Sequence, residues 1–343
     1  MDEQNKPELR LFVSFDIEGS THFKQSADEG SRVWGPFFRS FFEKFPGLVK
    51  RVESKILTDI GLPQSRSKLE VWKILGDEII FQKPIIGGLD AFVGTVASRQ
   101  ALIEGTQLLR ESGGDRERRE KHDGVAYPSQ LKATAWTAGF PNKNILLKNI
   151  GAGIAEDFIG PSIDLGFRIS KLATPARMPI SLTLAYMLAE TLQDIRFRTQ
   201  IHRHACGVEL CYLGRESLKG INKDTENYPV FFLKTIEAVD TLASAEESLT
   251  GKANLINVTK FCKECNGFMG SPFVLNDIDG LFPFFDESNE AATQYIQSYK
   301  ATLLPEKPTD LAQTIPEDAA LSDLGKLTSI IDEAAQHLKD HPS

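Results

Sequence analysis

Apolar and polar residues follow one another along the chain in a pattern that predicts alternating strands and helices. Residues 9–15 are apolar and rich in Phe and Val, which predicts a buried strand. A helix is expected next, because Ser20 or Thr21 can cap a helix N-terminus and residues 34–45 (WGPFFRSFFEKF) supply an apolar stripe. Residues 69–82 (LEVWKILGDEIIFQ) predict two strands that meet at a Gly76-Asp77 turn.

The pattern continues in the same manner up to residue 236 and then changes. It predicts helices at 88–111 and 161–173, the second with Pro161 in its first turn, and strands at 131–140, 206–214 and 228–236. This order predicts an α+β fold with an antiparallel sheet and helices on one face. Beyond it come loops, a Pro-broken acidic linker and an amphipathic helix at 321–338. We therefore expect one domain over residues 1–236 and a mixed, partly helical C-terminal extension over 237–343.

Composition narrows the class of protein. The 343 residues are 41% apolar and 25% charged, with a net charge of −8, which is typical of a soluble globular chain and argues against general nucleic-acid binding. No run of about eighteen apolar residues is present and the first residues are polar, so no membrane span or signal peptide is expected. Four cysteines in a chain of this length favour a cytoplasmic location.

Carboxylates stand at the ends of two predicted strands. Asp16 and Glu18 follow the first strand, and Asp77 lies on the hairpin tip. If these strands are neighbours, the carboxylates converge and offer the hard oxygen ligands that Mg²⁺ or Mn²⁺ prefers. The Gly19-Ser20-Thr21 turn that follows is suited to binding phosphate through its amide groups. The alternative is an exposed strand end and an ordinary turn residue.

Several short motifs occur in a fixed order over residues 8–236, and together they resemble those of the class III nucleotidyl cyclases, the catalytic domains of adenylate and guanylate cyclases. The matching stretches are FDIEGST (15–21), the Lys73, Gly76, Asp77 hairpin, WTAGF (136–140), the series Asp157, Gly160, Ile163, Arg168, and LKGI (218–221). The resemblance implies the ferredoxin-like sheet of that family and a homodimer whose active sites lie at the subunit interface.

The resemblance also implies a two-metal site. Asp16, Asp77 and the backbone carbonyl of Ile17 would bind two Mg²⁺ or Mn²⁺ ions about 3.5–4 Å apart, which activate the ribose 3′-hydroxyl of a nucleoside triphosphate. Arg168 would stabilise charge on the α-phosphate. Lys219, or alternatively Lys223, would contact the departing phosphates.

One departure from the family concerns Asp164, which stands where the family usually has an asparagine that orients the ribose. Asp164 is either a catalytic-site residue or the partner of Arg168 at i and i+4 on one helix face. In the head-to-tail dimer of the family, Asp157 and Arg168 come from the subunit that does not supply Asp16. A silent nucleotide-binding module is the remaining alternative.

A second departure concerns the base. Adenylate cyclases of the family read adenine with a lysine five residues before the hairpin glycine and with an aspartate, positions that are Val71 and Asp157 here. With Val71 in place of the lysine, we expect a pyrimidine base, with Trp72 or Phe158 filling the space. In its overall look the chain is similar to the pyrimidine cyclases (PycC) of Pycsar antiphage systems, which implies UTP or CTP as substrate, with UTP favoured over CTP, and a separate effector that senses the product. An adenylate cyclase with an unusual base pocket, making cyclic AMP from ATP, is the alternative.

The cysteines allow one further hypothesis. Cys262 and Cys265 form half of a possible zinc site, which Cys206 with Cys211, or His202 with His204, would complete. The second cysteine pair is widely spaced on a predicted strand, so buried free thiols are favoured.

Overall fold

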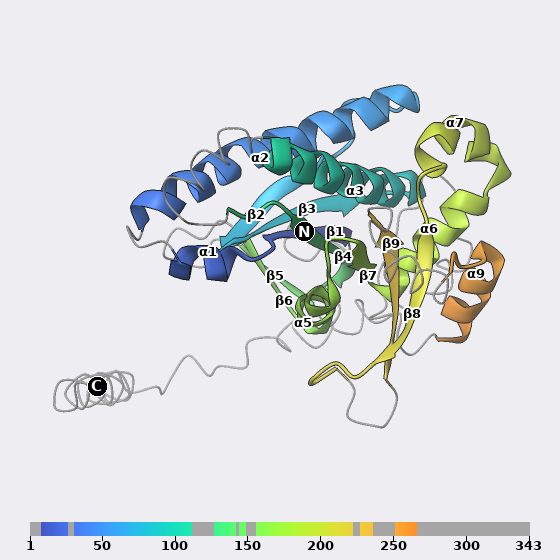
Figure 1. The fold of residues 1–343 in the computed structure, drawn as a ribbon. Helices are drawn as coiled ribbons and strands as arrows, with labels where there is room; N and C mark the ends of the chain where they lie inside the picture. Colours follow the sequence, from blue (N-terminus) through green and yellow to red (C-terminus); the bar gives the residue numbers. More distant parts are fainter. Residues whose placement is uncertain are drawn as a thin grey trace, which may run out of the picture. The chain divides into compact units, whose positions relative to one another are not determined.

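A seven-stranded sheet forms the centre of the structure, a computed structural model (Figure 1). The strand order is β2-β3-β1-β4-β7-β9-β8, and only the contact between β4 and β7 is parallel among the pairs of this sheet. The strands are β1 (Glu8–Ile17), β2 (Glu70–Leu75), β3 (Glu78–Ile85), β4 (Leu131–Phe140), β7 (Arg177–Ile180), β8 (Leu210–Glu216) and β9 (Tyr228–Lys234). The predicted α+β class with a mainly antiparallel sheet is confirmed.

The structure describes residues 8–26, 31–111, 127–141, 144–148, 156–221, 227–235 and 251–265. The predicted helix at 321–338 and Lys223 lie outside these segments. No helix within them combines the length and the apolar character that crossing a membrane requires.

Helices cover both faces of the sheet (Figure 1). The long helices α2 (Ser31–Asp59) and α3 (Gly88–Glu111) lie on one face, α3 packs against α6 (Leu182–Gln193), and α1 (Ser20–Ser26) precedes α2. The other face carries α5 (Pro161–Ile169), the short η2 (Ser170–Leu172), and a hairpin of β5 (Ile145–Lys148) and β6 (Glu156–Ile159). The expectation of helices on one face therefore holds for the long helices and not for α5.

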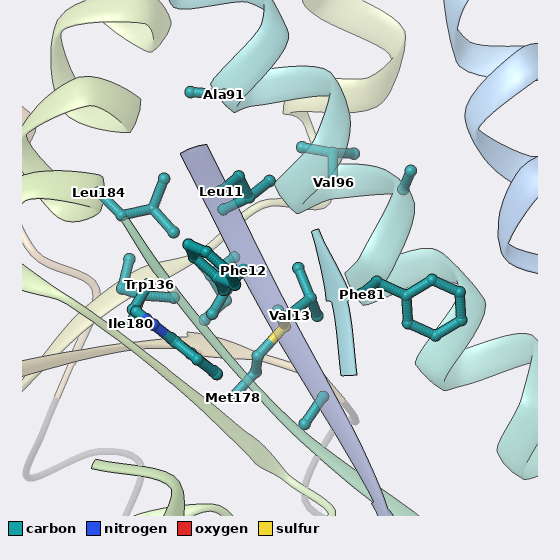
Figure 2. Close-up of a cluster of buried hydrophobic side chains, with 14 of the residues drawn as sticks. Leu11, Phe12, Val13, Phe81, Ala91, Val96, Trp136, Met178, Ile180 and Leu184 are labelled. Atoms are coloured by element: carbon teal, nitrogen blue, oxygen red, sulfur yellow. The ribbon is translucent and has the colours of Figure 1, made fainter. Parts of the chain in front are cut away.

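Successive side chains of the central strand β1 point alternately to the two faces of the sheet. Leu11 points toward α3, in line with Figure 2, where it lies on the side of Ala91 and Val96. Phe12 points the opposite way and stacks on Trp136 of β4, with ring centroids 5.6 Å apart. Because side chains alternate along a strand, Asp16 shares the face of Phe12, which is the face covered by α5 and the β5–β6 hairpin.

The region after β7 departs most from the sequence-based expectation. Residues 195–205 form helix α7 (Ile195–Ala205), so His202 and His204 lie on a helix and β8 starts at Leu210 instead of 206. The side chain of Asp194 accepts a hydrogen bond from the Arg196 amide and so caps this helix, a signal that the sequence contains. Helix α9 (Leu255–Glu264) packs against α6. The domain boundary at residue 236 stays a prediction.

Helix α5 docks on the sheet through a glycine. A Cβ atom on Gly166 would lie 2.2 Å from the Trp136 ring, so Gly166→Ala is expected to destabilise the fold by about 1–3 kcal/mol. Gly35→Ala in α2 is a matched control, because nothing lies within 4 Å of its Cβ position. Urea unfolding of both variants tests this, and equal stabilities would contradict the close contact.

Candidate active site

The structure brings the carboxyl groups of Asp16 and Asp77 together. Asp16 lies near the end of β1, which pairs with β3, and Asp77 lies in the β2–β3 turn, where Gly76 adopts a φ of 66° that favours glycine. Both side chains line the same cavity, and the charge of Asp77 acts on Asp16. The predicted convergence of these strand ends is therefore present in a single chain.

Residues of helix α1 hold Asp77 from the other side. The hydroxyl of Ser20 donates a hydrogen bond to Asp77, and Lys24 Nζ lies 3.4 Å from its Oδ1. Helix α1 starts at Ser20, and the carbonyl of Gly19 accepts the first helical hydrogen bond from Phe23. Ser20 is therefore buried beside a carboxylate and does not cap the helix as predicted, whereas Gly19 and Thr21 are exposed at the helix start.

The site also contains two charged residues, Glu78 and Lys132, that sequence patterns did not identify. Glu78 is the direct cross-strand neighbour of Asp16 on β3 and accepts a hydrogen bond from Ser14. Lys132 is the cross-strand neighbour of Asp16 on β4, and its Nζ lies 3.1 Å from Asp16 Oδ2. Strand register determines the positions of both residues. The sequence around a Lys or Glu at the start of a strand does not indicate which residue will lie opposite it.

These residues line one cavity of about 230 Å³. Its charged lining combines three carboxylates with two ammonium groups: Asp16, Asp77, Glu78, Lys132 and Lys171. One leucine and several small residues complete it: Leu75, Ser14, Ala133, Thr134, Ser170 and Ala173. A cavity with both signs of charge suits a ligand that is itself anionic and carries cations.

The pKa values of Asp16 and Asp77 shift in opposite directions. Burial raises the pKa of Asp16 from 3.8 to about 6, against the opposing effect of the Lys132 charge, and the nearby Asp77 charge adds to the increase. Burial acts on Asp77 in the same direction, but hydrogen bonds from Ser20 and Asp16 and the charge of Lys24 hold its pKa below the ordinary value. Burial also raises the pKa of Glu78. As the pH falls, Asp16 is therefore protonated before Asp77.

This titration predicts a pH dependence of stability in metal-free buffer. Because the folded-state pKa of Asp16 is about 6 and its ordinary value is 3.8, the folded state binds more protons between these values, and stability is lost as the pH rises through about 6. The melting temperature of the wild type minus that of Asp16→Asn should therefore fall from pH 5 to about pH 7. Thermal unfolding in EDTA measures the difference, and a constant difference would contradict the assigned pKa.

The donor set fits a hard divalent cation. Within the described segments no group of three or more His, Cys, Asp and Glu side chains is placed to hold a metal ion. Mg²⁺, however, is commonly bound by one or two carboxylates together with substrate phosphates and water. Asp16 and Asp77, with the backbone carbonyl of Ile17 beside them, match that pattern.

A second group of predicted residues gathers around β6. Lys73 Nζ lies 2.7 Å from Asp157 Oδ1, and Arg10 Nη2 lies 3.3 Å from Glu156 Oε1. These two ion pairs tie neighbouring residues of β6 to β2 and β1. The predicted base-reading aspartate is therefore paired with a lysine, although not with a residue at position 71.

Val71 does not belong to this group. Its partner across the ladder is Phe81, whose ring packs on Phe15 and so points toward the helices α2 and α3. A bulge between residues 71 and 73 turns Trp72 toward Phe12 and Phe158, with ring centroids at 5.3 and 5.1 Å, and turns Lys73 toward Asp157. In one chain the bulge separates Val71 from Trp72 and Lys73, and the role of Val71 in reading the base stays a prediction.

The remaining predicted residues lie outside the cavity lining. Asp164 is exposed on α5 and Arg168 is half-buried one turn later, and no ion pair joins them in this described helix. Lys219 is exposed in the turn after β8. Arg168, Asp157 and Lys219 are not among the residues that line the cavity within one chain.

The cysteines are free thiols. Cys262 is buried in α9, where burial raises its pKa to about 12, and Cys265 is buried at the end of the same helix. Cys206 is exposed and lies 3.5 Å from His202 Nε2 on α7, while Cys211 is buried on β8. His204 contacts Asp59 instead, with Nε2 and Oδ2 3.2 Å apart. A zinc site built from these groups has no support in their placement.

Comparison with known proteins gives similarity to solved structures alone. No family model and no curated protein matches the chain. Three similar structures are the adenylyl cyclase CyaB from P. aeruginosa, an adenylate cyclase from Trypanosoma brucei, and the guanylate cyclase domain of RhGC from Catenaria anguillulae in complex with GTP. Their identities to this chain are 13%, 13% and 9%, with TM-scores of 0.42, 0.39 and 0.40. The matches cover 68%, 68% and 67% of this chain and 96%, 91% and 98% of the other.

Proposed function

We propose that this chain is a nucleotidyl cyclase that converts a nucleoside triphosphate to its 3′,5′-cyclic monophosphate and pyrophosphate. The observation that carries the proposal is the convergence of Asp16 and Asp77 on one edge of a cavity that also contains lysines. This is the arrangement that the sequence motifs imply.

In this reaction the ribose 3′-oxygen bonds to the α-phosphorus, the bond from that phosphorus to pyrophosphate breaks, and the hydroxyl proton is released. Asp16, Asp77 and the Ile17 carbonyl would hold two Mg²⁺ or Mn²⁺ ions, which when bound lower the pKa of the hydroxyl and neutralise phosphate charge. The exposed Gly19 and Thr21 at the start of α1, with Ser20 between them, would contact the phosphates.

A second copy of the chain would complete the site. Arg168, Asp157 and Lys219 do not line the cavity of one chain, and in the head-to-tail homodimer that the sequence motifs imply the partner would supply them. Arg168 would then stabilise charge on the α-phosphate with its planar guanidinium, and Lys219 would contact the departing phosphates. Asp164, exposed beside Arg168, would face the ribose.

We propose a pyrimidine substrate, with UTP favoured. The ion pair of Lys73 and Asp157 offers one donor and one acceptor side by side, which matches the O4 acceptor and the N3–H donor of uracil. Trp72 packs next to it, with Lys73 Nζ 3.9 Å from the ring centroid, and this bulk favours a small base. On the resemblance to Pycsar cyclases, the cyclic product would act as a second messenger in antiphage defence, read by a separate effector.

The test is incubation of the purified protein with ATP, GTP, CTP or UTP and Mn²⁺, with products identified by mass spectrometry. Cyclic UMP that disappears in Asp16→Asn is the expected result. Cyclic AMP as the main product would leave the reaction in place and reject the pyrimidine assignment. Nucleotide binding without any cyclic product would favour a silent nucleotide-binding module.

A further inference from the structure

The positively charged side chain of Lys132 contacts the carboxylates beside the cavity. Its Nζ lies 3.1 Å from Asp16 Oδ2 and 3.2 Å from Glu18 Oε2, so a single ammonium group bridges two carboxylates. Its side chain is 27% exposed and lies directly across the β1–β4 ladder from Asp16. Strand pairing holds its backbone there, because opposite residues of antiparallel strands have fixed neighbours.

We propose that Lys132 is the resident cation of this site, which a divalent ion must displace from Asp16 before it can bind. The proposal rests on the proposed function, in which Asp16 is a metal ligand. A metal ion binds carboxylate oxygen at about 2.0–2.1 Å, and the ammonium group holds the same carboxylate now. Two cations at such separations repel each other strongly, so the ion and Lys132 compete.

After displacement from Asp16, the ammonium group of Lys132 can keep its ion pair with the neighbouring Glu18. Glu18 follows β1, and its side chain is 45% exposed, so Lys132 can release Asp16 and keep its second contact. It then remains at the wall of the cavity that it shares with Lys171. There it can pair with the negative charge that a nucleotide brings, so Lys132 would make ion binding depend on nucleotide binding.

The test is calorimetric titration of the full chain with Mn²⁺ alone, in the absence of nucleotide. Lys132→Met is expected to lower the Kd for Mn²⁺ by about tenfold, because the competing cation is gone. Lys171→Met is the matched control, since it removes one positive charge from the same cavity without a direct contact to Asp16, and it should change the Kd by less than about twofold. Lys132→Gln repeats the test with a polar side chain if the methionine variant does not fold.

Three outcomes are distinct. A tighter Kd in both position-132 variants, with Lys171→Met near the wild type, supports the resident cation. An unchanged or weaker Kd at position 132, or an equal change at position 171, overturns it while leaving the proposed function standing. Absence of Mn²⁺ binding in the wild type and in both position-132 variants overturns this inference, whereas absence of any cyclic product in the nucleotide assay overturns the proposed function.

Discussion

Asp16→Asn is expected to lower kcat for cyclisation by about a thousandfold or more, because the site loses the charged oxygen that holds the metal ions. The change removes one negative charge and little volume, so the variant should remain folded. Initial rates with Mn²⁺ and the preferred nucleotide measure the effect, and circular dichroism verifies the fold. Asp59→Asn is a control outside the site, where Asp59 contacts His204, and its kcat should remain within about twofold of the wild type.

The same variant tests the two-chain site. Arg168→Ala should also be inactive, because Arg168 would act from the partner. In a mixed dimer of the two variants, one site combines both changes and the other has an intact Asp16 and an intact Arg168. Mixing the two inactive proteins should therefore restore up to about a quarter of wild-type activity. Asp16→Asn with more than a tenth of wild-type kcat, or a mixture that stays inactive, would contradict this arrangement.

Glu53→Ala is expected to destabilise the fold by about 3–5 kcal/mol. Glu53 on α2 and Lys83 on β3 form an ion pair of 2.8 Å with both side chains fully buried, and Glu53 also accepts a hydrogen bond from the Leu69 amide at 2.8 Å. Removing the carboxylate leaves a buried ammonium group and a buried amide without their acceptor, and such groups are costly.

Urea unfolding measures the loss, and an exposed pair gives the matched control. Arg51 on α2 and Glu104 on α3 lie 3.5 Å apart, with Arg51 69% exposed, so Glu104→Ala should cost about 1 kcal/mol or less. The double variant Glu53→Met with Lys83→Met should recover part of the loss, because it leaves no unpaired charge. If Glu53→Ala were no more destabilising than Glu104→Ala, the buried pair would contribute little to the fold.

Local signals were enough to predict the first half of the fold and the carboxyl pair. Helix α3 and strand β4 have the predicted bounds, and the Gly76-Asp77 turn places Asp77 because few residues other than glycine adopt its backbone conformation. Hydrophobic spacing and turn chemistry act over a few residues, so they can be read directly from a sequence.

What the sequence did not reveal depends on pairing between distant segments. Lys132 and Glu78 meet Asp16 through strand register, and Lys73 meets Asp157 beside a bulge that exists only when β2 pairs with β3. Helix α6 was missed for another reason. It is apolar on nearly every side because it is almost fully buried, so its sequence lacks the polar face that marks an amphipathic helix.

The two ion pairs at β6 have a consequence for any redesign of the proposed base preference. Since Glu156 and Asp157 are adjacent and each pairs with a residue of a different strand, two ion pairs link the hairpin to the sheet at this point. A mutant library aimed at a new base preference would break one of these ion pairs if it varied Asp157. Trp72 packs against Lys73 and takes part in neither ion pair. Randomising Trp72 would therefore change the space for a base and leave both ion pairs in place.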